Sequence, residues 1–163
     1  MLESLVELGK TLIVSFSYLG IFLISFLSTS SIFFPTPLYL LIFFASGLGL
    51  HPFIVGVSAG VGSGLGEITG YLIGVGGREV AIQNKKPKFA KTIEFYFRKY
   101  GFLTIVIAAF LPFPFDFVGI LSGMSKYEVK KFLLAAIIGK TIKTTLIAYM
   151  GYWILPPLGG MLL

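Results

Sequence analysis

The sequence predicts an all-α polytopic membrane protein, built as an inverted repeat of a re-entrant helical hairpin followed by a transmembrane helix. Two observations support this fold class. Only 12% of the 163 residues are charged and 56% are hydrophobic, whereas a typical soluble domain carries about 25% charged residues. The segment 11–66 contains no Asp, Glu, Lys or Arg, although roughly 18 apolar residues are enough for one membrane span. A soluble globular domain is therefore excluded.

The N-terminal half is predicted to contain two membrane-spanning helices with a hairpin between them. Residues 12–29 form the first span, because they are predominantly apolar and contain neither proline nor a charged residue. The next apolar stretch, 31–50, contains Pro35 and Pro37, and each proline removes a helical hydrogen bond and clashes with the preceding turn. We expect this stretch to form a re-entrant hairpin with its tip at the prolines. Residues 53–77 form the second span.

The segment 78–101 is predicted to be a basic connector on the cytoplasmic side. Its Lys and Arg residues alternate with aromatic residues, as in an interfacial amphipathic helix that attracts anionic lipid headgroups. A solvated connector that only fixes orientation fits the same pattern. The residues expected to contact headgroups are Arg78, Lys85, Lys86 and Lys88.

The C-terminal half repeats the hairpin and the span. Residues 102–124 are interrupted by Pro112 and Pro114 and have basic residues on both sides, so the positive-inside rule places both ends in the cytoplasm. Each arm is about 15 Å of helix, half the hydrocarbon thickness, which predicts a second re-entrant hairpin. Residues 131–155 then cross outward. The chain is expected to be one multi-pass domain of the cell membrane, with its N-terminus inside and its C-terminus outside.

The two hairpins resemble each other in sequence, in two registers that differ by one residue. The proline register aligns the pair Pro35 and Pro37 with the pair Pro112 and Pro114. The Ser-Gly register aligns Ser46-Gly47 with Ser122-Gly123, which implies that one residue was gained or lost between the prolines and the glycines. The same register aligns Glu67 with Lys143. Units of opposite orientation form an inverted repeat, and transporters of this kind bind substrate near the midplane. We expect the prolines to form hairpin tips and the two glycines to act as hinges.

Four ionisable residues are expected at the depth where the bilayer tolerates charge least. Glu67 lies in the middle of its span, Lys140 and Lys143 share one face of the last span, and Asp116 follows the second hairpin tip. A charge at the bilayer centre costs at least about 2.5 kcal/mol, so these side chains are predicted to meet and to bind substrate or a proton. The alternative is a buried ion-pair network that fixes helix register. Tyr71 is added because it lies one turn after Glu67, where it either hydrogen-bonds to the carboxylate or packs.

Other classes of site lack the residues they need. With no cysteine and one histidine, the chain is not expected to hold a metal, a disulfide or a histidine-based catalytic site. We predict no catalytic residue and no cofactor, with a proton as the one coupling species considered. The basic residues border apolar segments and therefore indicate topology, so membrane lipids are the expected partners, nucleic acid is not, and a homo-oligomer is left open. Glycines at four-residue spacing in 56–74 are expected to allow close helix packing.

Two ordered motifs make the chain resemble the DedA family, also called the VTT-domain or SNARE-associated Golgi protein family. The first motif comprises Gly62, Gly66, Glu67, Tyr71, Gly74 and Gly77-Arg78, and the second comprises Phe110-Leu111-Pro112, Ser122-Gly123-Met124, Phe132, Gly139 and Trp153. The resemblance implies two facing re-entrant hairpins and a role in moving lipids, including undecaprenyl phosphate and phospholipids, with proton coupling in some members. Many members carry an arginine soon after the second hairpin proline, where this chain has Phe115-Asp116.

The leading functional hypothesis is a lipid transporter or scramblase that moves a polar or anionic headgroup, of a phospholipid or a polyprenyl phosphate, through a polar site between the hairpins. A proton-coupled exporter of small solutes or drugs is the alternative. A membrane assembly factor without a transported substrate is the third class. An enzyme is disfavoured, because the sequence shows no Ser/His, paired-Asp or metal-ligand pattern.

Overall fold

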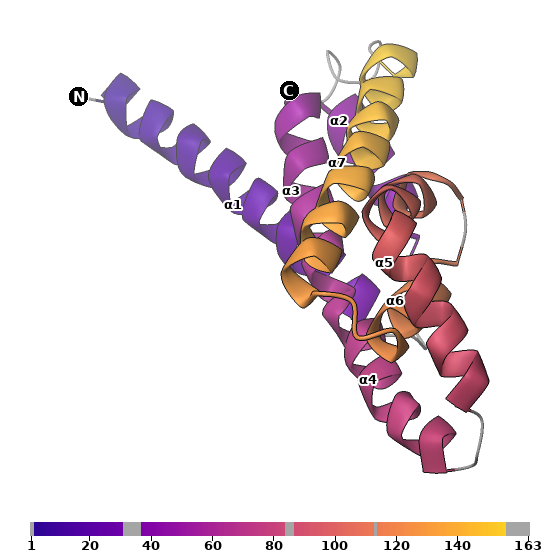
Figure 1. Ribbon diagram of the computed structural model, residues 1–163. Coiled ribbons are helices and arrows are strands. Elements are labelled where there is room, and N and C mark those ends of the chain that lie inside the picture. The colour runs from indigo at the N-terminus through magenta and orange to yellow at the C-terminus, as the bar shows by residue number, and fades with distance from the viewer. Residues whose placement is uncertain (1, 31–36, 84–86, 113, 156–163) are drawn as a thin grey trace.

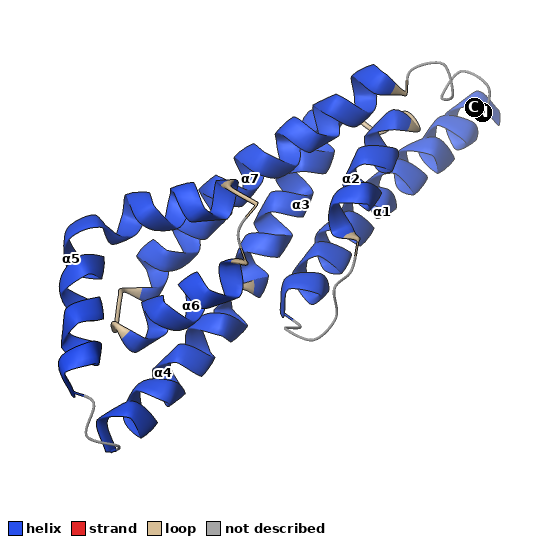
Figure 2. Cartoon of the chain, turned by 90° about the vertical axis from the view of Figure 1, so that its right-hand side faces the viewer, coloured by secondary structure: helices blue, strands red, loops and turns tan. Residues whose placement is uncertain are grey.

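The described residues form helices joined by turns and irregular segments, and they contain no strand. The sequence predicted this all-α fold class. The computed structural model describes residues 2–30, 37–83, 87–112 and 114–155, and within them the side chains other than those of 2–15, 79–94, 96 and 98. The helices, shown in Figure 1 and Figure 2, are α1 (Leu2–Ser30), α2 (Leu38–Gly47), α3 (Pro52–Gly66), α4 (Ile68–Gln83), α5 (Pro87–Phe110), α6 (Phe115–Met124) and α7 (Val129–Ile154).

Within the described residues, two stretches of helix are long and apolar enough to cross a membrane. They are Pro52–Arg78 and Val129–Ile154, which correspond to the spans predicted at 53–77 and 131–155. The first stretch is not one helix, because α3 and α4 are separated at Glu67. The third predicted span, 12–29, lies within α1.

The helix α5 joins two segments that the sequence separated. It runs without a break from Pro87, inside the predicted connector, to Phe110, at the end of the first predicted hairpin arm. Proline can begin a helix because its missing N–H is one that the first turn leaves unused anyway. The helix ends just before Pro112, in the turn that leads to α6. The first arm of the second hairpin is therefore continuous with the basic connector.

The helices α3 and α7 lie side by side at the centre, and the short helices α2 and α6 each pack against a helix of the other half of the chain. The helix α7 packs along α3, with α1 on the other side of α3 and α5 beside α7 (Figure 2). The short helix α2 of the first half packs against α7 of the second half. In the same way, α6 of the second half packs against α4 of the first.

Glycines on α3 allow the close approach of α7. A Cβ atom built on Gly56 or Gly60 would lie 2.8 Å from the Cβ atom of Thr145 or Thr141, respectively, which is closer than folded proteins tolerate. The hydroxyl of Thr144 donates a hydrogen bond of 2.7 Å to the Gly56 carbonyl across the same interface. The prediction that these glycines serve helix packing is confirmed.

The same local structure occurs twice, in the proline register. Three backbone bonds close the turn after α2 and three equivalent bonds close the turn after α6, with a positive φ at Gly49 (109°) and at Lys126 (55°). The bonds are Leu48 N to Phe44 O, Gly49 N to Ser46 O and Leu50 N to Ala45 O, repeated as Ser125 N to Leu121 O, Lys126 N to Gly123 O and Tyr127 N to Ser122 O.

Glycine contacts extend this register along the long helices. Gly62 and Gly139 each lie against a carbonyl of a neighbouring helix, of Phe22 and Val106, and Gly74 and Gly151 lie against those of Ile120 and Phe43. The Ser-Gly register was therefore wrong. The two Ser-Gly pairs match in sequence by chance, and no residue is gained or lost between the prolines and the glycines of the two hairpins. Glu67 corresponds to Thr144 and not to Lys143.

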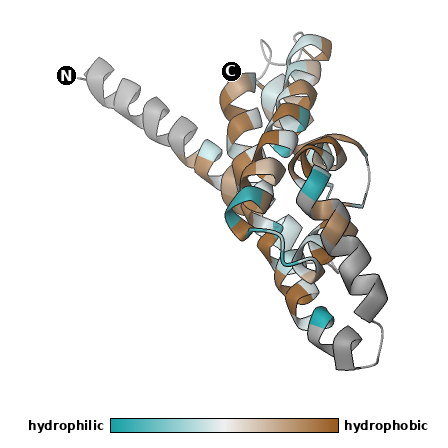
Figure 3. Cartoon of the chain, viewed as in Figure 1, coloured by the Kyte–Doolittle hydropathy of each residue, from teal (hydrophilic) through white to brown (hydrophobic). Residues whose placement is uncertain are grey.

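The buried residues form two apolar clusters and the outer surface is also apolar. One cluster is centred on Phe132 and Ile105 between α4, α5, α6 and α7, and the other on Ile42 and Val55 between α1, α2, α3 and α7. Large apolar side chains such as Leu103 are exposed. Figure 3 shows that hydrophobic residues occur along the coloured helices of both halves. An apolar surface of this extent is typical of contact with lipid acyl chains.

Candidate functional site

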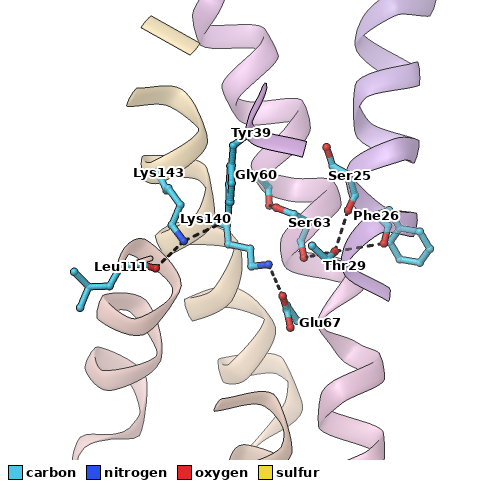
Figure 4. A network of polar contacts seen from close by, with 10 residues as sticks. All are labelled: Ser25, Phe26, Thr29, Tyr39, Gly60, Ser63, Glu67, Leu111, Lys140 and Lys143. Carbon is cyan, nitrogen blue, oxygen red and sulfur yellow. Dashed lines mark hydrogen bonds and ion pairs between the residues drawn. The ribbon is translucent and has the colours of Figure 1, made fainter. Parts of the chain in front are cut away.

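The centre of the molecule contains a buried ion pair between Glu67 and Lys140. Glu67 is the residue between α3 and α4, and its carboxylate oxygen Oε1 accepts a hydrogen bond from Nζ of Lys140 on α7 (Figure 4). Glu67 is only 3% exposed and Lys140 only 6%. The ammonium also lies 5.3 Å from the centre of the Phe115 ring, in cation–π contact. Two of the four predicted charges therefore neutralise each other directly.

The local sequence breaks the helix where Glu67 lies. The N–H of Glu67 bonds to the carbonyl of Leu65, so the regular hydrogen-bond ladder is interrupted. The carbonyl of Ser63 accepts instead a bond of 2.9 Å from the hydroxyl of Thr29 on α1. Gly66 makes this close approach of α1 feasible, because a Cβ atom there would collide with Phe26 and Thr29. The contact with α1 thus satisfies a carbonyl group that the break would leave unpaired.

The second carboxylate oxygen of Glu67 is chemically unused. Oε2 is fully buried and has no hydrogen-bond partner among the described residues. A buried acceptor without a donor costs free energy, about 1–3 kcal/mol and more for a charged group. Such an oxygen can take a proton, a water molecule or a donor group from a ligand.

Lys143 differs from Lys140, because its hydrogen-bond partners among the described residues are neutral. Its Nζ donates a hydrogen bond of 2.8 Å to the carbonyl of Leu111 and a longer one of 3.4 Å to the hydroxyl of Tyr39. The ammonium also lies 5.5 Å from the centre of the Tyr39 ring. Leu111 follows the last residue of α5, and Tyr39 is in the first turn of α2, so Lys143 bridges the two predicted hairpins (Figure 4).

The charge of Lys143 is not compensated by a carboxylate within ion-pair distance in the described part of the chain. The residue is half-buried, so it is not sealed inside the helix bundle. An ammonium group has three N–H donors, and the two contacts described do not use them all. This arrangement can bind an anionic group.

Asp116 lies near the ion pair without joining it. It belongs to the first turn of α6, where the positive end of the helix dipole favours a carboxylate. Its backbone packs against Gly70, one turn after Glu67. Its carboxylate forms no ion pair with the described residues. Of the four charges expected to meet, Glu67 and Lys140 are in direct contact, and Asp116 and Lys143 form no ion pair with the described residues.

Tyr71 serves another contact. Its hydroxyl donates a short hydrogen bond of 2.6 Å to the carbonyl of Tyr127, in the turn before α7. Its ring packs on Phe132, with 5.2 Å between ring centres. Of the two alternatives for Tyr71, packing is observed and a hydrogen bond to the Glu67 carboxylate is not.

The predicted headgroup-binding residues are described only in part. Nη1 of Arg78 donates a hydrogen bond of 2.5 Å to the carbonyl of Met124, the last residue of α6, where a cation stabilises the helix end. Lys85 and Lys86 lie outside the described residues, as does the side chain of Lys88. Contact between these bases and lipid stays a prediction.

The predicted hairpin residues lie at helix ends. Pro37 and Pro114 directly precede α2 and α6, Pro112 lies in the turn after α5, and Pro35 is outside the described residues. Gly47 and Gly123 are buried packing positions.

A Cβ atom on Gly47 would lie 2.8 Å from Cβ of Leu155, and one on Gly123 would lie 2.8 Å from the backbone nitrogen of Val75. These contacts place α2 against α7 and α6 against α4. A hinge role for either glycine stays a prediction.

Sequence reasoning missed the residues that hold the charges in place. Tyr39 and Thr29 are polar side chains in long apolar stretches, and this signal could have marked them as hydrogen-bonding partners. The Leu111 carbonyl could have been found from the rule that the last carbonyls of a helix lack intrahelical donors.

The chain is similar to proteins of one family. The family model described as the VTT domain matches residues 34–153, well over half of the chain. A relative from Methanocaldococcus jannaschii, named uncharacterized protein MJ0201, is 27% identical over 143 residues, which cover 87% of this chain and 88% of that protein. No solved structure gives a significant match.

Proposed function

Because the chain belongs to the VTT-domain family, a membrane family whose members are generally transporters rather than enzymes, we propose that it moves lipids across the membrane. The proposed substrate is a lipid with a polar or anionic headgroup, either a phospholipid or a polyprenyl phosphate. The headgroup crosses at the polar site between the two hairpins while the acyl chains stay in the surrounding lipid.

The observation that carries this proposal is the uncompensated charge of Lys143. Lys140 is already neutralised by Glu67, whereas Lys143 has a carbonyl and a phenol as its partners. A charge held by neutral groups near the bilayer centre is costly, and a phosphate headgroup would offset that cost when it binds. Lys143 is thus the proposed headgroup contact during passage.

The repeated architecture supports a transport mechanism. The equivalent turns after α2 and α6 and the exchange of these two helices between the halves fit an inverted repeat. In this proposal the N-terminus and the 78–101 connector are cytoplasmic, and the turn between α2 and α3 faces outward. Inverted repeats allow a site to open alternately to the two sides of a membrane.

A proton-coupled exporter of small solutes is the second candidate. Its support is the buried oxygen Oε2 of Glu67, which has no donor among the described residues and can accept a proton. Such an exporter would stop when the proton gradient is dissipated. A lipid scramblase would continue at an unchanged rate, so this single treatment separates the two functions.

The test of lipid transfer is reconstitution of the full chain into liposomes that contain a fluorescent anionic lipid. A membrane-impermeant quencher then reports how fast lipid from the inner leaflet reaches the outer leaflet. Wild type is expected to transfer lipid faster than protein-free liposomes, and Lys143→Met to lose most of that excess. Lys131→Met is the matched control, because Lys131 lies on the same helix but is exposed and paired with Glu128 at 2.7 Å. A wild-type rate equal to that of protein-free liposomes would exclude the proposal.

A further inference from the structure

A polar cavity lies away from the Glu67–Lys140 pair, at the other end of α3. It has a volume of about 370 Å³, and its walls come from α1, from the turn before α3 and from the end of α7. The polar residues in its lining are Tyr18, His51, Tyr149 and Tyr152, and Gly49 and Pro52 complete the turn. This volume is at the small end of the range for ligand sites, so it can hold a headgroup but not a whole lipid.

Each polar side chain of this cavity can donate a hydrogen bond, and no carboxylate from the described residues lines it. The hydroxyl of Tyr18 accepts a bond of 2.9 Å from the N–H of His51, which leaves its own proton free to donate. The hydroxyls of Tyr149 and Tyr152 have no acceptor among the described residues, and neither does the imidazole of His51. Among the described residues, the lining contains no acidic side chain. A ligand that only accepts hydrogen bonds fits such a set of donors.

The internal repeat provides a control for this polarity. In the proline register, Tyr149 and Tyr152 correspond to Leu72 and Val75 on α4. The same positions of the fold are thus aliphatic in the other half, so helix packing does not require hydroxyl groups there. An aromatic anchor at the membrane surface would explain the rings, but Trp153, which is 74% exposed, fills that role without lining the cavity.

We propose that the cavity formed by Tyr18, His51, Tyr149 and Tyr152 binds the phosphate group of a lipid headgroup at the outer surface of the membrane. Phosphate oxygens accept several hydrogen bonds at once, which the three hydroxyls and the imidazole of the lining can supply. The position outside the membrane centre and the role in lipid transfer rest on the proposed function. In this proposal a lipid headgroup occupies the cavity before or after it passes Lys143.

The experiment is a binding titration of the full chain in maltoside micelles, which contain no phosphate. The probe is dihexanoyl phosphatidylglycerol, and binding is measured by calorimetry. Tyr149→Phe/Tyr152→Phe removes two hydroxyls and keeps the rings, so the dissociation constant is expected to rise about tenfold or more. Trp153→Phe is the matched control and is expected to bind like wild type. His51→Gln is a second variant and is also expected to bind the probe more weakly than wild type.

Two further probes identify the ligand. Dihexanoylglycerol, which lacks the phosphate, is expected to bind at least tenfold more weakly, and equal binding would overturn the inference. Equal affinity of wild type and the double tyrosine variant would overturn it as well. Glycerol 1-phosphate distinguishes a lipid ligand from a water-soluble phosphate. If it binds more weakly than the lipid, the ligand is a lipid headgroup, and if it binds equally well, the ligand is a water-soluble phosphate.

The inference and the proposed function fail separately. Lipid transfer by wild type tests the proposed function, and the affinity lost in the double tyrosine variant, which keeps Lys143, tests the cavity. If the cavity binds no phosphate but transfer by wild type persists, the cavity is not a headgroup site and the proposed function stands.

Discussion

Loss of one partner from the Glu67–Lys140 pair should destabilise the fold far more than loss of both. Lys140→Met leaves the Glu67 carboxylate, 3% exposed, with neither oxygen bonded to a described side chain. Breaking a buried ion pair in this way costs about 3–5 kcal/mol, because an uncompensated charge stays buried. Adding Glu67→Gln removes that charge, so the double variant should lie within about 1–2 kcal/mol of wild type.

The assay is equilibrium unfolding in mixed micelles, followed by circular dichroism. The double-mutant cycle of wild type, Lys140→Met, Glu67→Gln and the double variant gives the coupling free energy of the pair. Lys131→Met is again the control, because its ion pair with Glu128 is exposed and should leave unfolding unchanged. If Lys140→Met unfolds at the same denaturant concentration as Lys131→Met, the ion pair does not stabilise this fold and the reasoning is refuted.

Two further predictions concern the contacts that place the site. Gly60→Val should push α7 away from α3 and lower stability by about 2 kcal/mol or more, since a Cβ atom there collides with Thr141. Gly76→Ala, where nothing lies within 4 Å of the new atom, should unfold like wild type, and equal effects of the two would contradict the packing argument. Tyr71→Phe should cost about 1 kcal/mol through loss of the bond to Tyr127, and no change in the unfolding midpoint would mean that this bond is not stabilising.

The sequence was informative where single residues dominate the local energetics. Prolines cannot continue a helix, so breaks next to Pro37, Pro112 and Pro114 could be predicted. Charge is expensive in a membrane, so Glu67 and Lys140 could be selected as candidates and are indeed in contact.

The remaining features depend on which helices come together, and a single sequence does not contain that information directly. The break at Glu67 is stabilised by Thr29 from α1, a contact between residues far apart in the chain. The register of the repeat is visible in backbone hydrogen bonds and glycine contacts. The alignment based on the matching Ser-Gly pairs differs from this register by one residue. Nothing in the pattern distinguished Lys140 from Lys143, although only Lys140 has an acidic partner among the described residues.

The central claim is that the positive charge of Lys143 carries an anionic headgroup across the membrane. The most direct measurement compares transfer of anionic lipid by wild type, Lys143→Arg and Lys143→Met in liposomes of the same composition. We predict that Lys143→Arg keeps most of the wild-type rate and that Lys143→Met falls to near the rate of protein-free liposomes. A Lys143→Met rate equal to that of wild type would contradict the claim.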